Sequence, residues 1–221
     1  MTETIAETVE VPGFLRDNVL AIERRYRAGQ WTMDISGETW HSTDWVKPLL
    51  SQTLECFPWA SVSGLEIVYS DGRRVACDAP ESHALPRLES AGRGDVGCNG
   101  LAATLDLCLY WIDAERRLGS SRIPHAGYLV MDRLNTDTAS IDLTIYPNLF
   151  TDTIHRLQKR ERRFDAVPIP FAPAAAKNRK RLHDSLVSWE SRLHGTITSW
   201  DSDLIDVVHR HGFSDESAPF E

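Results

Sequence analysis

The chain has 221 residues, of which 42% are hydrophobic and 25% are charged, and its formal net charge at pH 7 is −8. These proportions are typical of a globular protein and exclude a disordered or fibrous chain. No apolar run approaches the roughly 18 residues that cross a bilayer, and the acidic N-terminal segment lacks the basic and apolar regions of a secretory signal. We therefore expect a cytoplasmic protein that does not contact a membrane.

The four cysteines, at positions 56, 77, 98 and 108, are too few and too scattered for a disulfide framework. None lies in a Cys-x-x-Cys pair, and the sequence His209-x-His211 has no cysteine or acidic pair at ligand spacing. The sequence thus predicts reduced thiols, no metal site and no cofactor.

The first half of the chain is predicted to form two helices and a β-hairpin. Apolar side chains recur at helical spacing over residues 14–28 and 43–56. Residues 65–69 and 74–77 are separated by a turn that contains Asp71-Gly72, a dipeptide that favours a tight hairpin turn. Residues 79–97 hold two prolines and three glycines, and they predict an irregular loop.

The middle of the chain is predicted to form a buried helix, two strands and a further helix. Residues 98–118 are apolar on nearly every side of a helix, which is typical of a central, buried one. Residues 128–132 and 140–146 alternate as strands do, and Asn148 is expected to cap a helix that carries Phe150, Ile154 and Leu157.

The C-terminal part is predicted to be helical. Prolines at 168, 170 and 173 indicate an extended connection, so we place a sub-boundary at 166–174 in an otherwise single domain of residues 1–221. The segment 175–211 carries an apolar seam that packs either on the protein's own sheet or on a second copy in an oligomer. The predicted fold class is α+β: an antiparallel sheet of hairpins on a buried central helix, with a helical C-terminal part.

A basic segment interrupts the acidic chain between residues 154 and 183. It predicts either an anion-binding belt, for RNA, a nucleotide or an acidic protein, or merely the solvated faces of surface helices. No nucleic-acid-binding motif accompanies it, so nucleic acid is not the favoured partner. The candidate anion-binding or partner-binding residues are Arg156, Lys159, Arg160, Arg162, Arg163, Lys177, Arg179, Lys180 and Arg181.

The candidate catalytic residues are Cys98, His125 and Asp142. Cys98 follows a glycine-bearing loop and opens the predicted buried helix, where unpaired N–H groups and the helix dipole favour a thiolate. His125 begins the next strand and Asp142 lies in the strand after it. Neighbouring antiparallel strands would let Asp142 orient His125 toward Cys98, which is the geometry of a catalytic triad.

The order of these residues resembles that of a known superfamily. The segments VGCNGLA (96–102), HAGYLV (125–130) and IDLT (141–144) are similar to the transglutaminase-like and arylamine N-acetyltransferase-like branches of the papain-type cysteine superfamily, over residues 92–144 only. The resemblance implies a thioester at Cys98, with His125 as general base and acid and Asp142 as the orienting residue. It also implies acyl transfer to, or hydrolysis of, an acyl or amide substrate.

Each candidate residue also has an ordinary structural interpretation. Cys98 is of a type that often packs in a core, His125 suits a strand entrance, and Asp142 suits the polar side of a half-exposed strand. The alternative function is a non-catalytic protein-binding module, such as an acidic immunity or antitoxin-like inhibitor that binds through its charged and tryptophan-bearing surface. The seven tryptophans are more typical of a core than of such a surface.

Overall fold

The fold is given by a computed structural model. It describes residues 27–36, 45–78, 98–112, 117–135, 137–147, 149–150, 153–158, 163–168, 172–203 and 208–213. The predicted loop at 79–97 lies outside these residues. So does the predicted helix at 14–28, apart from Arg27 and Ala28, which are not helical.

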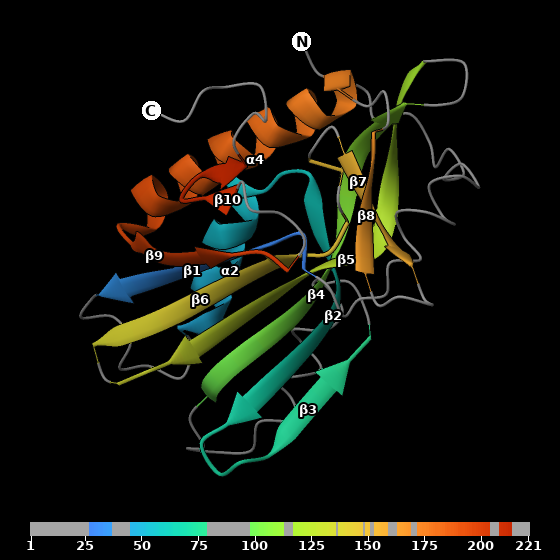
Figure 1. Cartoon of the computed structure of the whole chain (residues 1–221). Coiled ribbons are helices and arrows are strands. Elements are labelled where there is room, and N and C mark those ends of the chain that lie inside the picture. The colour runs from blue at the N-terminus through green and yellow to red at the C-terminus, as the bar shows by residue number, and fades with distance from the viewer. Residues whose placement is uncertain are drawn as a thin grey trace.

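Among the described residues, the body of the fold is an antiparallel sheet of seven strands in the order β3-β2-β4-β5-β6-β1-β9 (Figure 1). The predicted α+β class is therefore confirmed. The predicted hairpin and the two predicted strands are confirmed as well, within β2, β3, β5 and β6. The strands are β1 (Gly29–Ser36), β2 (Ala60–Tyr69), β3 (Arg74–Cys77), β4 (Cys98–Ile112), β5 (Leu118–Arg133), β6 (Thr138–Ile145) and β9 (Thr196–Asp201).

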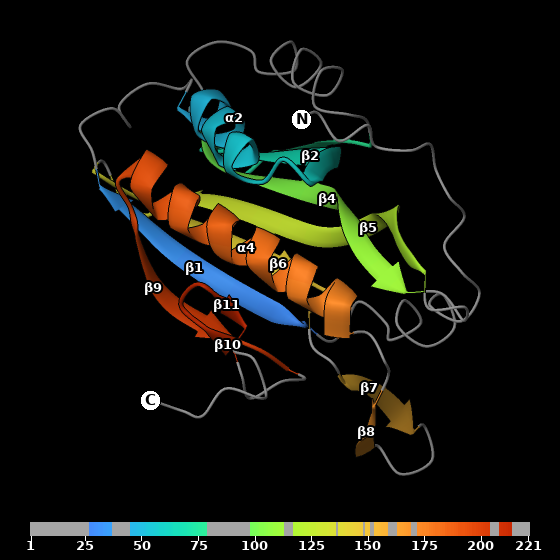
Figure 2. The same ribbon diagram turned by 90° about the horizontal axis from the view of Figure 1, so that it is seen from above.

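Two helices, α2 (Val46–Cys56) and α4 (Ala172–Leu193), lie across one face of this sheet (Figure 2). The core lies between the helices and the sheet. Two polar contacts inside it tie α4 to the rest of the fold. The Trp59 indole donates to Ser185 Oγ at 3.0 Å, and the Trp189 indole donates to Thr53 Oγ1 at 3.3 Å.

Most of the tryptophans belong to this core. Trp31, Trp45, Trp59, Trp111 and Trp189 are buried, as expected for large apolar side chains. Among the described residues Trp200 is the only exposed tryptophan.

The prediction of a buried helix over 98–118 is wrong, because Cys98–Ile112 is the central strand β4. Its large apolar side chains occupy every second position and point to the core, at Leu101, Leu105, Leu107, Leu109 and Trp111. The intervening side chains are smaller or polar. The segment is apolar throughout, but its large side chains alternate with smaller or polar ones, as in a strand. The neighbouring strands β2 and β5 form hydrogen bonds with the backbone of β4 on both sides.

The C-terminal part is only half helical. Helix α4 begins at Ala172, within the predicted proline connection, and Pro173 lies in its first turn, where a missing N–H is tolerated. The helix ends at Leu193, and His194 has a positive φ of 50°. The chain continues as β9, β10 (Val208–His209) and β11 (Gly212–Phe213), so the prediction of helix to residue 211 is wrong.

Helix α4 does not form a separate unit. Leu182, Leu186 and Trp189 are fully buried in the same core as the sheet, so the predicted seam packs on the protein's own sheet. The helix expected after Asn148 is not formed either. Residues Thr153–Gln158 (β7) and Arg163–Pro168 (β8) pair instead as a separate two-stranded antiparallel ribbon.

Candidate functional site

Cys98 lies at the start of a strand and not at the start of a helix. It pairs with Tyr69 of β2, is 8% exposed, and its thiol donates a hydrogen bond to the Gly100 carbonyl at 3.3 Å. Burial raises the pKa of the Cys98 thiol to about 11, although the contact with Gly100 opposes this rise. The thiol is therefore protonated at neutral pH, which is the opposite of the activation that the sequence suggested.

His125 lies in an irregularity of β5, where the strand gains residues relative to β4. Leu105 faces Gly127, whereas Leu107 faces Ile123, and His125 between them has a φ of 54°. The His125 backbone N–H donates to Asp106 Oδ1 at 2.8 Å. The backbone of this residue is thus fixed by a carboxylate, but not by Asp142.

The strand register keeps the three predicted catalytic residues apart. Gly100 of β4 pairs with Asp132 of β5. Cys98 lies two residues from Gly100 along β4, and His125 lies seven residues from Asp132 along β5, in the opposite direction along the sheet. At about 3.3 Å per residue, the separation of Cys98 and His125 along the sheet is roughly 25–30 Å. Asp142 pairs with Val130, which is five residues, or about 16 Å, from His125. The structure does not bring the three together.

The basic residues of α4 are engaged within the protein. Lys177 Nζ lies 4.9 Å from the centre of the Tyr110 ring, and the Arg181 guanidinium carbon lies 3.9 Å from it. Arg181 also donates to the Tyr110 hydroxyl at 2.6 Å. Arg179 donates to a backbone carbonyl, and Lys180 pairs with Asp184 on the next turn. Much of this positive charge is therefore used in holding α4 against β4.

Two further basic residues lie in the strands of the β7–β8 ribbon. Arg156 pairs in register with Asp165, and Arg163 pairs with Gln158. Lys159, Arg160 and Arg162 lie outside the described residues.

The most distinctive polar surface is the sheet face opposite the helices, which we call the open face. No described helix or strand covers it, and its side chains are the alternate residues of the strands, which are mostly partly exposed. Asp34 of β1 and Asp132 of β5 both face Ser140 of β6, which lies between them. Asp142 lies on β6 two residues from Ser140, on the same face.

These three carboxylates form a compact group, which we call the acidic triplet. Strand spacing places the Cα atoms of Asp34 and Asp132 about 10 Å apart, with that of Asp142 about 8 Å from each. Among the described residues none of the three forms an ion pair, and Asp142 accepts one hydrogen bond, from Thr32 Oγ1 at 2.5 Å. The triplet therefore carries negative charge that the described fold does not neutralise.

Asp132 shows the effect of this crowding. Its carboxylate lies over Gly100, where an added Cβ would come within 2.6 Å of Asp132 Oδ1. Partial burial, and then the charge of Asp142, raise the pKa of Asp132. A cation bound on this face would oppose this rise in the pKa of Asp132, because it would favour the charged form of the carboxyl group.

Of the triplet, the sequence singled out only Asp142. Asp34 lies between Met33 and Ile35, and Asp132 follows Met131, so each acid alternates with core residues in a strand. That alternation was a usable signal for acids on one face. Their convergence depends on the order β5-β6-β1, which puts β6, a strand from much later in the chain, beside β1 and has no local signature.

Two further properties of the described residues bear on function. No group of three or more histidine, cysteine, aspartate or glutamate side chains among them is arranged to hold a metal ion. None of the described helices is both long enough and apolar enough to cross a membrane.

Comparison of the chain with protein-family models, curated proteins and solved structures finds no match.

Proposed function

We propose that this chain is a non-catalytic, cytoplasmic protein-binding module that docks a partner with a basic surface on its open face. The observation that carries the proposal is the acidic triplet of Asp34, Asp132 and Asp142. Three carboxylates from three adjacent strands share one face, and no described cation pairs with them.

Charge supports the choice of partner. The whole chain has a net charge of −8, so its long-range field attracts cationic surfaces and repels nucleic acid. The carboxylates of Asp34 and Asp142 are only partly exposed, so lysine and arginine side chains of a partner would pair with them more strongly than on a fully exposed surface. Electrostatic complementarity of this kind speeds association and selects against acidic partners.

The rigidity of the platform also supports a binding role. The three acids belong to paired strands of the sheet, not to loops, and the opposite face of those strands is fully packed by Trp31, Met33, Met131 and Ile141. A surface held in this way loses little conformational entropy when a partner binds. The cysteine acyltransferase or hydrolase hypothesis stays a prediction, and the protonated state and position of Cys98 do not support it.

The test compares two triple variants that change the net charge equally. In the first, Asp34, Asp132 and Asp142 are replaced by asparagine, which keeps the shape and an acceptor oxygen at each site. In the control, three acids away from the triplet are replaced by the corresponding amides: Glu55 on α2, Asp71 in a turn and Asp184 on α4. Both variants should fold as the parent does.

The tagged parent and both variants are used for affinity capture from the native host, followed by titration calorimetry with the purified partner. We expect one basic partner at a stoichiometric ratio, with an affinity that falls steeply with salt. The triplet variant should bind at least about tenfold more weakly than the control, since each charge-assisted contact contributes on the order of 1.5 kcal/mol or more. Equal losses in both variants, an acidic partner, or no partner at any salt concentration would each contradict the proposal.

A further inference from the structure

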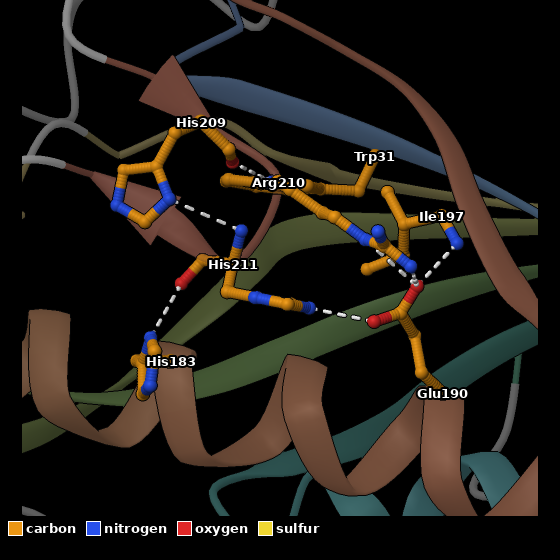
Figure 3. Close-up of polar contacts among 7 residues, drawn as sticks. All are labelled: Trp31, His183, Glu190, Ile197, His209, Arg210 and His211. Atoms are coloured by element: carbon orange, nitrogen blue, oxygen red, sulfur yellow. Dashed lines mark hydrogen bonds and ion pairs between the residues drawn. The ribbon is translucent and has the colours of Figure 1, made fainter.

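The C-terminal strands β10 and β11 form a small hairpin that is docked on α4, which we call the C-terminal hairpin (residues 208–213) (Figure 3). Phe213 is 5% exposed and stacks on Phe150 with ring centres 5.3 Å apart. It also meets the edge of Trp31 at 5.5 Å. Docking of the hairpin therefore closes the core over Trp31 and Phe150.

Glu190 of α4 is the polar anchor of this hairpin. Its carboxylate accepts from Arg210 Nη2 at 2.7 Å and from His211 Nε2 at 2.6 Å, and both donors belong to the hairpin turn (Figure 3). It also accepts from the Ile197 backbone N–H of β9 at 2.5 Å. One side chain, only 13% exposed, thus joins the hairpin, α4 and β9.

His209 is held in a form that cannot accept a further proton without loss of a contact. Its Nδ1 atom accepts a hydrogen bond from the His211 backbone N–H at 3.2 Å, so Nδ1 carries no proton. The His209 carbonyl accepts from the Trp31 indole at 2.9 Å, which links this backbone to β1. Protonation of Nδ1 would place two N–H groups against each other.

The surroundings of His209 also oppose a positive charge. On α4 the facing titratable side chains are His183 and Glu190, and on the hairpin they are Arg210 and His211, while Trp31 of β1 carries no charge (Figure 3). The rings of His183 and His211 lie 5.9 Å apart, and His183 Nδ1 donates to the His211 carbonyl at 3.2 Å. Glu190 is already shared by Arg210 and His211, so its charge is not available to His209.

We propose that His209 is an acid-sensitive latch: its neutral ring, through the bond from the His211 N–H, fixes the hairpin turn in the shape in which Arg210 and His211 reach Glu190 of α4, and its protonation releases the hairpin. Protonation breaks the contact between the two histidines of the hairpin and adds a positive charge beside His183, His211 and Arg210. The release that follows uncovers Trp31 and Phe150, which Phe213 shields in the docked state. This device is independent of the acidic triplet, which lies on the other face of the sheet.

The pKa shifts agree with this geometry and set the pH range. Burial, and then the charges of His183 and His211, lower the pKa of His209 below its usual value of 6.5, although a hydrogen bond with the Phe213 backbone opposes them. The released hairpin therefore binds the proton more readily than the docked one, and docking weakens as the pH falls below 6.5. Burial alone would raise the pKa of Glu190, but hydrogen bonds from Arg210, His211 and Ile197 lower it below 4.5. The anchor consequently stays charged through the range in which the latch opens.

The test follows the His211 amide, which reports directly on its bond to His209. Amide hydrogen exchange is measured by NMR between pH 7.5 and pH 5.5 and corrected for the intrinsic pH dependence of exchange. We expect the corrected exchange of this amide to become roughly tenfold faster over that range, the order of magnitude that accompanies loss of one intramolecular hydrogen bond. Amides of β4 and β5 should not change.

Two substitutions separate the latch from a general effect of acid. His209→Asn and His209→Gln keep an acceptor oxygen but do not titrate, so at least one of them should dock at pH 7.5 and stay docked at pH 5.5. His125→Asn is the control, because it removes another histidine at a position with positive φ, where asparagine is tolerated. It should respond to pH as the parent does. The proposal is overturned if the parent shows no change, if a docked His209 variant keeps the parent's pH response, or if both His209 variants are released at pH 7.5.

Discussion

Asn178 is the residue whose replacement tests most directly how α4 is held on the sheet. Its side chain is completely buried. Beyond the end of β2, no described strand pairs with this edge of β4, and the Asn178 amide takes the place of such a strand. It accepts from the Tyr110 backbone N–H at 2.9 Å and donates to the Tyr110 carbonyl at 3.0 Å. It also donates to the Leu149 carbonyl at 2.8 Å.

The expected cost of Asn178→Ala follows from these three contacts. Each contributes a net of about 1 kcal/mol, and a buried backbone group left without a partner costs about 1–3 kcal/mol. Tyr110 is partly exposed, so water can replace some of the lost contacts. We therefore expect about 1 kcal/mol for each of the three contacts, a loss of about 3 kcal/mol in the free energy of unfolding. Asn178→Leu fills the space without restoring any hydrogen bond, and should still cost about 2 kcal/mol or more.

The assay is urea unfolding followed by far-UV circular dichroism and by tryptophan fluorescence. Asp184→Ala is the control, because among the described residues this exposed acid pairs only with Lys180, on the same helix, and its loss should change stability by less than about 0.5 kcal/mol. A loss below about 1 kcal/mol for Asn178→Ala would refute the view that the amide substitutes for a strand. Full stability of Asn178→Leu would show that packing, and not hydrogen bonding, fixes this edge.

Three further predictions concern other parts of the sheet. Cys98 in the native protein should react with iodoacetamide at least about a hundredfold more slowly than in urea, because burial raises its pKa from 9.0 to about 11. The partly exposed Cys77 serves as the accessible control thiol, and rapid labelling of Cys98 in the native protein would contradict the prediction. Gly119→Ala should cost about 1–3 kcal/mol in urea unfolding, because the new Cβ would lie 2.5 Å from the buried Trp111 ring, and an unchanged midpoint would show that the ring can move. Asp106→Asn should cost about 1–3 kcal/mol at pH 7. Burial alone would raise the pKa of Asp106, but its hydrogen bonds lower it, so the stabilisation is present above about pH 4 and the difference from the parent should shrink as the pH falls to 3.

Some elements could be predicted from local sequence because only one period fits them. In β6, Ile141, Leu143 and Ile145 alternate with Ser140, Asp142 and Thr144. A helix would not place the three apolar side chains on one face, whereas a strand does. Helix α2 shows the opposite case, with buried residues three and four positions apart at Val46, Leu49, Leu50 and Thr53. The hairpin of β2 and β3 was marked by Gly72, whose φ of 83° suits its turn.

The candidate sites were decided by contacts that are distant in sequence. The segment from Cys98 is apolar enough for a buried helix or a central strand, and the neighbouring β2 and β5 decide between them, because a strand paired on both sides satisfies its backbone groups. Once β4 is a strand, its register with β5 sets how far Cys98 lies from His125, and no local pattern contains that register.

Composition, alternation and turn residues thus determined the fold class and half of its elements, because these depend on periodicity along the chain. The acidic triplet and the C-terminal hairpin were decided only by the tertiary structure. The triplet requires β1 to lie beside β6, and the histidine cluster requires residue 183 of α4 to lie beside residues 209 and 211. Such convergence depends on which surfaces bury each other, and that is a property of the folded chain as a whole.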